Sequence, residues 1–227
     1  MQQETVIGYD AQAYNQREKG YSPEPIRDAV WELVGDYVGG AVMDAGSGEG
    51  GWIKRLKQSQ AITRIISVDI VDDGASHIEG IEFHLSDLSE SNLPCLDSQL
   101  DWIFALEVLE HLANPRHFVR EAHRCLTSGG KFVITTPNNE SLRAKLSFLF
   151  RGYFPAFCDH DYHSAGHITP ILELGLRRMA DESGFAEIQF LYPLPGRIPK
   201  TSLEWRKLIP VLQGNLFSDG LFAILTK

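Results

Sequence analysis

The chain has 227 residues, of which 43% are hydrophobic and 22% charged, a composition typical of a globular protein rather than a disordered one. Its 21 basic and 30 acidic side chains give a formal net charge of −9, so we expect no nucleic-acid partner. The three cysteines include no C-x-x-C pair, and residues 1–20 lack the apolar stretch of a signal peptide. We therefore expect no disulfide framework, no zinc site and a cytoplasmic location.

The predicted elements begin with an N-terminal helical segment, residues 1–38, in which 25–38 form one amphipathic helix. From residue 40 onward, short β-branched runs alternate with longer stretches of helical spacing. The predicted strands are 41–45, 64–70, 81–85, 100–106, 131–136 and 221–226. Most of them lack strict polar alternation, which indicates burial on both faces and hence a parallel sheet. We predict one domain, 1–227, with a doubly wound α/β sheet.

Two helices of the second half carry start and stop signals. Asn114 followed by Pro115 is typical of a helix start, and the glycines of 128–130 predict the end of that helix. Thr169 followed by Pro170 predicts another start, with the helix ending at 183–184.

Two inserts interrupt this alternation. Residues 139–167 follow the fifth strand, and we predict that they form a helical lid at the edge where open α/β sheets bind ligands. Residues 193–214 are rich in proline and precede the last strand. The aromatic cluster within 148–157 would pack inside the lid, or would face an apolar acceptor or a membrane surface, because basic residues lie between the rings.

A glycine turn follows the first predicted strand, where residues 44–51 read D-A-G-S-G-E-G-G. Glycine allows a positive φ and a close approach of the backbone to a ligand. The spacing also satisfies G-x-G-x-x-G, the dinucleotide motif that places a pyrophosphate on a helix N-terminus. Asp44 and Glu49 would repel a pyrophosphate, however, whereas a cationic or zwitterionic ligand would tolerate them.

Two further acids end the next strands. Asp69 ends the second strand, at the place where an acid accepts hydrogen bonds from both ribose hydroxyls of an adenosine ligand. Asp87 follows the third strand, where a carboxylate would accept the adenine amino protons. The alternative for Asp87 is an ordinary turn or helix cap.

These residues resemble the class I methyltransferases that use S-adenosylmethionine. The resemblance rests on the turn at 44–50, on Asp69 and Asp87, on A-L-E-V-L-E-H-L at 105–112, on S-G-G at 128–130 and on T-P-N at 136–138. Residues 107–112, followed by Asn114 and Pro115, are most similar to the subgroup of ubiquinone-pathway O-methyltransferases and type 11 small-molecule methyltransferases.

The resemblance implies a seven-stranded, mostly parallel sheet with an antiparallel last strand, and S-adenosylmethionine as the cofactor. The residues that it assigns to cofactor binding are Asp44, Gly46, Ser47, Gly48, Gly50, Asp69, Ile70, Asp87, Leu88 and Glu107. The function we expect is methyl transfer to a small-molecule, lipophilic acceptor, at a hydroxyl. An NAD(P)-binding oxidoreductase and a catalytically silent cofactor-binding protein are the alternatives.

Methylation of a hydroxyl requires a group that takes its proton, and histidine is the usual choice. The catalytic candidates are His111, which follows the fourth strand, and His163 and His167 in or after the lid; His160 also lies there. We predict no bound metal. Two metal sets stay open: Asp159, His160, His163 and His167, and a Mg²⁺ set of Glu107, Glu110 and His111 that the resemblance would allow.

Overall fold

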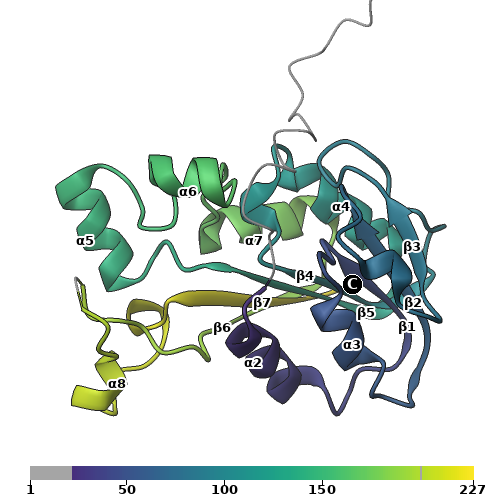
Figure 1. The fold of residues 1–227 in the computed structure, drawn as a ribbon, viewed down its shortest axis with the longest axis horizontal. Coiled ribbons are helices and arrows are strands. Elements are labelled where there is room, and N and C mark those ends of the chain that lie inside the picture. Colours follow the sequence, from purple (N-terminus) through teal and green to yellow (C-terminus); the bar gives the residue numbers. More distant parts are fainter. Residues whose placement is uncertain (1–21, 200) are drawn as a thin grey trace, which may run out of the picture.

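The computed structural model describes residues 22–199 and 201–227, which form a seven-stranded sheet with helices on both faces (Figure 1). The strands, in their order across the sheet, are β3 (Glu82–Leu85), β2 (Ile62–Asp69), β1 (Gly40–Ala45), β4 (Leu100–Leu106), β5 (Leu126–Pro137), β7 (Gly220–Thr226) and β6 (Glu187–Leu191). All neighbouring pairs are parallel except those of β7, which runs antiparallel to β5 and to β6. The predicted fold class is confirmed.

The order of the strands places the candidate acids at one edge of the sheet. In β1, Asp44 pairs with Ser67 of β2 on one side and with Phe104 of β4 on the other. Because all three strands are parallel, their carboxyl ends meet at the same edge, which is where open α/β sheets bind ligands.

Alternate side chains of each central strand enter two separate hydrophobic clusters. On one face, Met43 and Ile103 pack with α4 (Pro115–Cys125) and α7 (Glu173–Ser183). On the other face, Val42 and Phe104 pack with α2 (Glu24–Val34) and α3 (Gly51–Leu56). Helices therefore cover both faces, as the apolar strand sequences predicted.

Three predicted helix boundaries were wrong. The first helix ends at Val34 and not at residue 38. The helix α4 begins at Pro115, where the side chain of Asn114 accepts a hydrogen bond from the backbone of His117, but it ends at Cys125. The glycines of 128–130 belong to β5, because Leu126 is already extended and pairs with Leu100 of β4.

The start of α7 lies at Glu173 rather than at Pro170. Leu172 is still extended, and the backbone N–H of Glu173 donates to Oε2 of Glu140, 2.8 Å away. A side chain that is distant in sequence thus fixes this helix start, and the local pattern at 169–170 could not show it.

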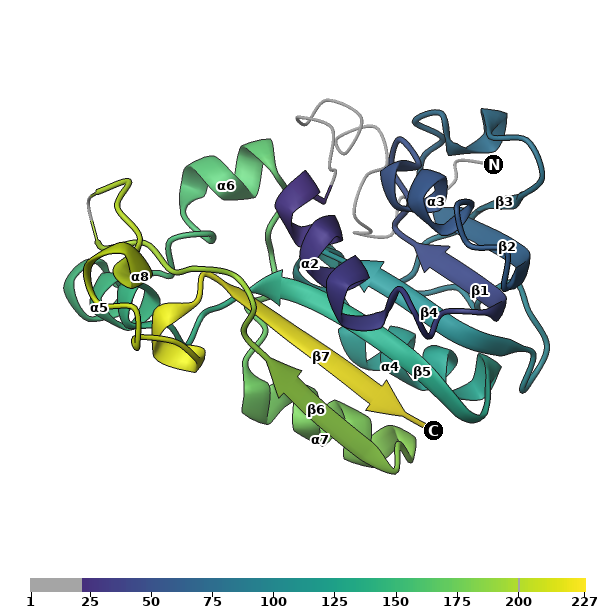
Figure 2. The ribbon, with the colours of Figure 1, turned by 90° about the horizontal axis from the view of Figure 1, so that it is seen from below.

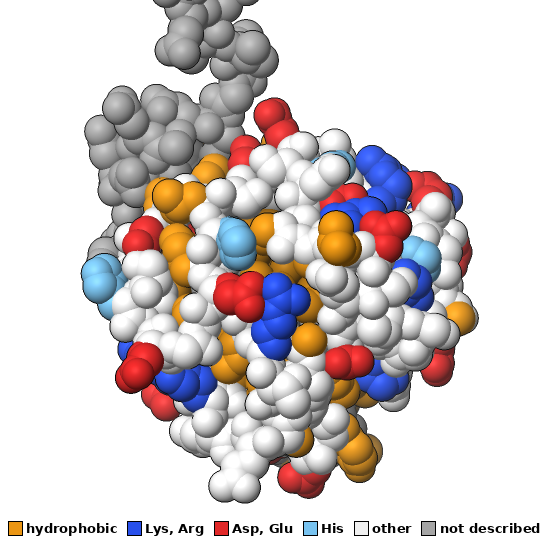
Figure 3. Space-filling view, turned by 90° about the vertical axis from the view of Figure 1, so that its right-hand side faces the viewer, with side chains coloured by type: hydrophobic (Ala, Val, Ile, Leu, Met, Phe, Trp, Pro, Cys, Tyr) orange, Lys and Arg blue, Asp and Glu red, His pale blue; other side chains and the backbone are white. Residues whose placement is uncertain are grey.

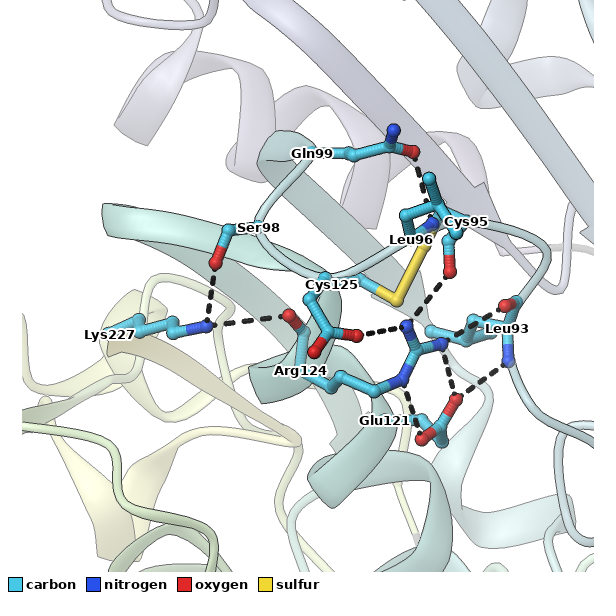
Figure 4. The surroundings of a disulfide bond; sticks show 10 residues. Leu93, Cys95, Leu96, Ser98, Gln99, Glu121, Arg124, Cys125 and Lys227 are labelled. Atoms are coloured by element: carbon cyan, nitrogen blue, oxygen red, sulfur yellow. Dashed lines mark hydrogen bonds and ion pairs between the residues drawn. A yellow bond between two sulfur atoms is a disulfide. The ribbon is translucent and has the colours of Figure 1, made fainter.

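We predicted no disulfide framework, but the structure contains one disulfide bond, between Cys95 and Cys125 (Figure 4). Arg124 ties the same loop to the end of α4, because its guanidinium donates to the carbonyls of Leu93 and Cys95. Disulfides persist mainly in oxidising compartments, so the cysteines no longer support a cytoplasmic location, which stays a prediction. None of the helices in the described part of the chain is long and apolar enough to cross a membrane.

Both inserts lie at the same end of the molecule (Figures 1 and 2). The lid insert contains α5 (Leu142–Arg151) and α6 (Asp159–Ser164), and the second insert contains α8 (Trp205–Leu208), followed by the short helix η3 (Asn215–Phe217). The start of the lid insert is joined to the chain just after its end, since the Asn139 amide donates to the carbonyl of Ile171 at 3.1 Å. Two further short helices, η1 (Ala75–His77) and η2 (Leu109–His111), follow β2 and β4.

Candidate active site

The glycine turn after β1 has the geometry that its sequence predicted. Gly46, Gly48 and Gly50 have φ values of 77°, 49° and 75°, in the left-handed region that favours glycine. The N–H of Gly48 donates to Oδ2 of Asp69 at 2.8 Å. This contact joins the turn to the end of β2, so two motifs that were predicted separately form one site.

A cavity of about 410 Å³ opens beside this turn, a size that suits a small-molecule ligand. Its lining includes the predicted residues Asp44, Gly46 and Ser47. The other lining residues are Ser22, Arg27, Glu49, Gly51, Trp52, Lys54 and Leu106. Arg27 was missed in the sequence because it comes from α2, which no motif links to the turn.

Asp44 is a buried acid at the wall of this cavity, and only 2% of it is exposed. Burial, together with the negative charge of Asp69, raises the pKa of Asp44 to about 8, while the guanidinium of Arg27 acts in the opposite direction. Its Oδ2 accepts no hydrogen bond from any described residue. Such an atom is costly unless a donor satisfies it, and a cationic ligand group in the cavity would provide that donor.

Asp69 is buried as well, but the backbone around it supplies hydrogen bonds. Besides the Gly48 N–H, the N–H of Val71 donates to its Oδ1 at 3.3 Å. Burial raises the pKa of Asp69, and these backbone donors partly offset the rise. Its carboxylate is therefore held in a fixed orientation next to the turn.

The third predicted acid is placed differently. Oδ1 of Asp87 accepts a hydrogen bond from the N–H of Ser89 at 2.8 Å, which is the turn that the sequence left as an alternative. Leu88 is 6% exposed and packs in the core cluster that contains α4. Neither residue lines the cavity, so their contacts with an adenine ring stay a prediction, as does the role of Ile70 beside Asp69.

Two glutamates lie together after β4, where Glu110 is buried and Glu107 is half-buried. Glu107 has a φ of 59°, unusual for a residue other than glycine, and such strain clusters at functional sites. Burial raises the pKa of Glu107 to about 7 and that of Glu110 well above its ordinary value, to which the negative charge of Glu107 also contributes. Neither carboxylate oxygen of Glu110 accepts a hydrogen bond from the part of the chain that the structure describes.

Two of the three predicted catalytic histidines lie together. The rings of His111 and His167 are 4.8 Å apart between centroids. Nδ1 of His111 lies 3.3 Å from the carbonyl oxygen of Gly166, and Nδ1 of His167 lies 2.6 Å from that of Ala156. A carbonyl can only accept, so both Nδ1 atoms donate, and in the neutral form of each ring the lone pair that a base or a metal ligand needs lies on Nε2.

The third histidine lies elsewhere. Residues 159–164 of the lid insert form the helix α6, on which His160 and His163 are exposed. His163 contacts the ring of Tyr162 and does not join His111 and His167.

Glu110, His111 and His167 could together hold a metal ion, because one ligand atom from each lies within 4.8 Å of the others. This group shares two members with the Mg²⁺ set considered from the sequence, but His167 takes the place of Glu107. The set with Asp159 and His160 is not brought together among the described residues. The prediction that no metal binds stays untested.

The comparisons with known proteins agree with this geometry. Residues 15–189 match a family described as a methyltransferase domain. The chain belongs to this methyltransferase family. A probable S-adenosylmethionine-dependent methyltransferase of Mycolicibacterium smegmatis is 31% identical over 101 residues, which are 43% of this chain and only 38% of that protein. A probable chloroplastic tocopherol O-methyltransferase of Oryza sativa is 30% identical over 146 residues, 59% of this chain and 38% of that protein.

Solved methyltransferase structures share the fold of this methyltransferase domain. A possible histamine N-methyltransferase of Thermotoga maritima superposes with a TM-score of 0.64 at 19% identity, over 89% of this chain and 87% of that one. An S-adenosylmethionine-dependent methyltransferase of Archaeoglobus fulgidus gives 0.60 at 21% identity, over 88% and 94% of the two chains. The predicted class I family is confirmed, whereas the ubiquinone-pathway subgroup stays a prediction.

The family and the fold imply S-adenosylmethionine as the cofactor, and the residues present fit it. Its methionine part is a zwitterion, and the cavity lining offers a carboxylate at Asp44 and a guanidinium at Arg27. The unpartnered Oδ2 of Asp44 suits an ammonium donor. The oxidoreductase alternative would instead need a pyrophosphate beside this buried acid.

Proposed function

We propose that the protein transfers the methyl group of S-adenosylmethionine to a hydroxyl of a small-molecule acceptor. The observation that carries the acceptor type is the pair His111 and His167, whose Nδ1 atoms both donate to backbone carbonyls. With Nδ1 donating, Nε2 is the atom of each ring that would accept a proton from an acceptor. A neutral amine is nucleophilic without help, whereas a hydroxyl is a weak nucleophile until a base removes its proton.

Binding would be divided among the residues around the glycine turn. Asp44 would accept from the ammonium of the methionine part, and Arg27 would pair with its carboxylate. Asp69, held by the N–H groups of Gly48 and Val71, would accept from the ribose hydroxyls. Asp87 would lie nearer the adenine amine, and Glu107 below the methyl donor.

The cofactor supplies an activated methyl carbon on its sulfonium, so the protein has to bind, align and exclude water. Holding the acceptor oxygen in line with that carbon can contribute about 7–11 kcal/mol. A histidine that receives the acceptor proton would then contribute a further factor of about 10²–10⁴ in rate.

Two measurements test this function. In calorimetry, we expect S-adenosylhomocysteine to bind and NADH not to bind; the reverse result would identify an oxidoreductase. Incubation with S-adenosylmethionine labelled on the methyl group, with matched phenol and aniline acceptors, should label the phenol. Labelling of the aniline alone would contradict the hydroxyl acceptor, and tight binding without any labelled product would indicate a silent cofactor-binding protein.

A metal-assisted form of the same reaction is favoured by one observation, the grouping of Glu110, His111 and His167. A divalent cation there would lower the pKa of a bound hydroxyl, so the histidines would act as ligands and not as bases. Activity that EDTA abolishes and that Mg²⁺, Mn²⁺ or Zn²⁺ restores would show this form. Activity that EDTA leaves unchanged would leave the histidines as proton acceptors.

A further inference from the structure

The end of the molecule built by the two inserts exposes large apolar side chains. In the lid insert, Phe148, Leu149 and Phe150 are 54%, 72% and 78% exposed at the end of α5. In the second insert, Ile209 and Val211 are 49% and 81% exposed just after α8. We call these five residues the insert surface. Isolated exposed hydrophobic residues are ordinary, but two such groups at one end of a molecule indicate an interaction site.

The two inserts are held together, so the insert surface is a single structural feature. The carboxylate of Asp219 pairs with Arg143 of α5 and with Arg197 of the second insert. The ring of Trp205 at the start of α8 contacts that of Phe217 in η3, with centroids 5.7 Å apart, and η3 in turn contacts α5. Both views of the fold show α5 and α8 at this end (Figures 1 and 2).

The charge of the two inserts is opposite to that of the rest of the chain. Residues 139–167 and 193–214 contain seven basic and four acidic side chains, a net charge of +3, whereas the whole chain has −9. The remaining residues therefore carry a net charge of −12. At the opposite end of the molecule, acidic and basic side chains are interspersed (Figure 3).

The three apolar residues at the end of α5 are better suited to contact a lipid bilayer than a flat protein surface. Three consecutive helical residues point in directions about 100° apart, so Phe148, Leu149 and Phe150 are spread over more than half of the helix circumference. A flat protein partner would cover only one of them well. Lipid chains can surround all three, while the exposed Lys145 and Arg151 beside them would remain among the headgroups.

We propose that the insert surface docks on an anionic lipid bilayer. Its apolar side chains enter the headgroup boundary, and the basic residues of the two inserts contact the lipid phosphates. The acidic remainder of the molecule is repelled by the same membrane, so this end faces the bilayer and the rest points away from it. This places the lid, which lies beside the histidines, against the phase in which a lipophilic acceptor dissolves.

Vesicle co-sedimentation of the full chain tests the proposal. With vesicles of equal parts phosphatidylcholine and phosphatidylglycerol, we expect the protein to pellet, and less so as salt is raised. With phosphatidylcholine alone, it should remain in the supernatant. The double variant Phe150→Asp/Val211→Asp should lower the partition constant at least about tenfold, and Arg151→Glu/Lys207→Glu should do so only for the anionic vesicles.

Tyr37→Asp is the matched control, because Tyr37 is 78% exposed, as Phe150 is, but lies outside the inserts. It should bind vesicles like the wild type, and all variants should bind S-adenosylhomocysteine normally, which shows that they fold. Absence of binding to the anionic vesicles, or equal binding by the Phe150→Asp/Val211→Asp variant, would overturn the proposal. So would a wild-type dimer in sedimentation velocity that this variant dissociates, since the surface would then join two copies of the chain. Methyl transfer to a water-soluble acceptor does not enter this test, so the two proposals fail separately.

Discussion

The acids at the ends of β1 and β2 are buried, as is Glu110 after β4, yet the hydrogen bonds and charges around them differ. Asp69 accepts two backbone N–H groups, and Asp44 lies next to it with the guanidinium of Arg27 nearby. Glu110 accepts no hydrogen bond from the described residues, and the negative charge of Glu107 raises its pKa further.

This difference suggests separate roles: the first region binds the cofactor, and the second lies where the methyl group is transferred. Backbone donors hold Asp69 in place before any ligand arrives, as a binding site for a neutral ribose requires. The pair after β4 has little to stabilise its charge until a positive group arrives, whether a sulfonium or a metal ion. Variants of the first region should therefore change the affinity for the cofactor, and variants of the second should change kcat.

The largest effect should come from the histidines beside the second region. We expect His111→Asn or His167→Asn to lower kcat about 10²–10⁴-fold, with the affinity for S-adenosylhomocysteine nearly unchanged. His163→Asn is the control, because that residue is exposed on α6, and its kcat should stay at the wild-type level. If only His163→Asn is inactive, the lid must rearrange to bring it over the methyl group.

The two regions touch at Gly46, where a Cβ atom would lie 2.5 Å from Cγ2 of Val108. We expect Gly46→Ala to lower the free energy of unfolding by about 2–5 kcal/mol, because the left-handed φ and the overpacking both cost stability. Cofactor binding and kcat should fall together. Chemical denaturation and calorimetry measure these effects.

Gly129→Ala separates the two causes. Gly129 has a φ of 80° with nothing within 4 Å of its Cβ position, so the variant should show only the backbone cost of about 1–2 kcal/mol. Equal losses of stability in the two variants would mean that the contact with Val108 is unimportant.

The first region alone should respond to Asp69→Ala. Removal of hydrogen bonds to a charged acceptor should weaken cofactor binding by about 1.5–3 kcal/mol, or roughly 10–150-fold in the dissociation constant. Asp87→Ala should have a smaller effect, since Asp87 already accepts from Ser89. A dissociation constant that changes for Asp87→Ala and not for Asp69→Ala would reverse these roles.

The most gradual effect is a pH dependence of stability. The folded pKa of Asp44 is raised from 3.8 to about 8, so between these values the folded state holds a proton that the unfolded chain has lost. The contribution of Asp44 to the free energy of unfolding is therefore fully present below its pKa in the unfolded chain. It decreases as pH rises towards 8, by at most about 1.4 kcal/mol per pH unit. In thermal unfolding, Asp44→Asn should decline less than the wild type from pH 5 to 8, and parallel curves would remove Asp44 as the cause.

The sheet could be predicted because each strand is specified by residues that are close together in the sequence. The apolar runs at 41–45 and 100–106 are long enough to specify buried parallel strands, and the glycine turn and Asp69 lie at fixed distances along the chain. The strand β6 has no such run; its residues alternate between half-buried and exposed at the edge of the sheet.

The remaining parts of the site depend on contacts that no spacing rule encodes. Arg27 reaches the cavity only because α2 folds over the same face as the turn. His167 meets His111 because the N–H groups of Ile168 and Thr169 donate to the carbonyl of Glu110, a connection across more than fifty residues. The bond between Cys95 and Cys125 likewise depends on a loop that packs against the end of α4.

The hydrogen bond between Asn139 and Ile171 closes the base of the lid insert, and Glu140 with Glu173 adds a second link at the same place. The residues of the lid insert, which lie between the two ends that these hydrogen bonds join, can therefore change in number and sequence without displacing β5 or α7. During evolution, such an insert can be exchanged as a unit, so the choice of acceptor can diverge among relatives while the residues that hold the methyl donor remain in place.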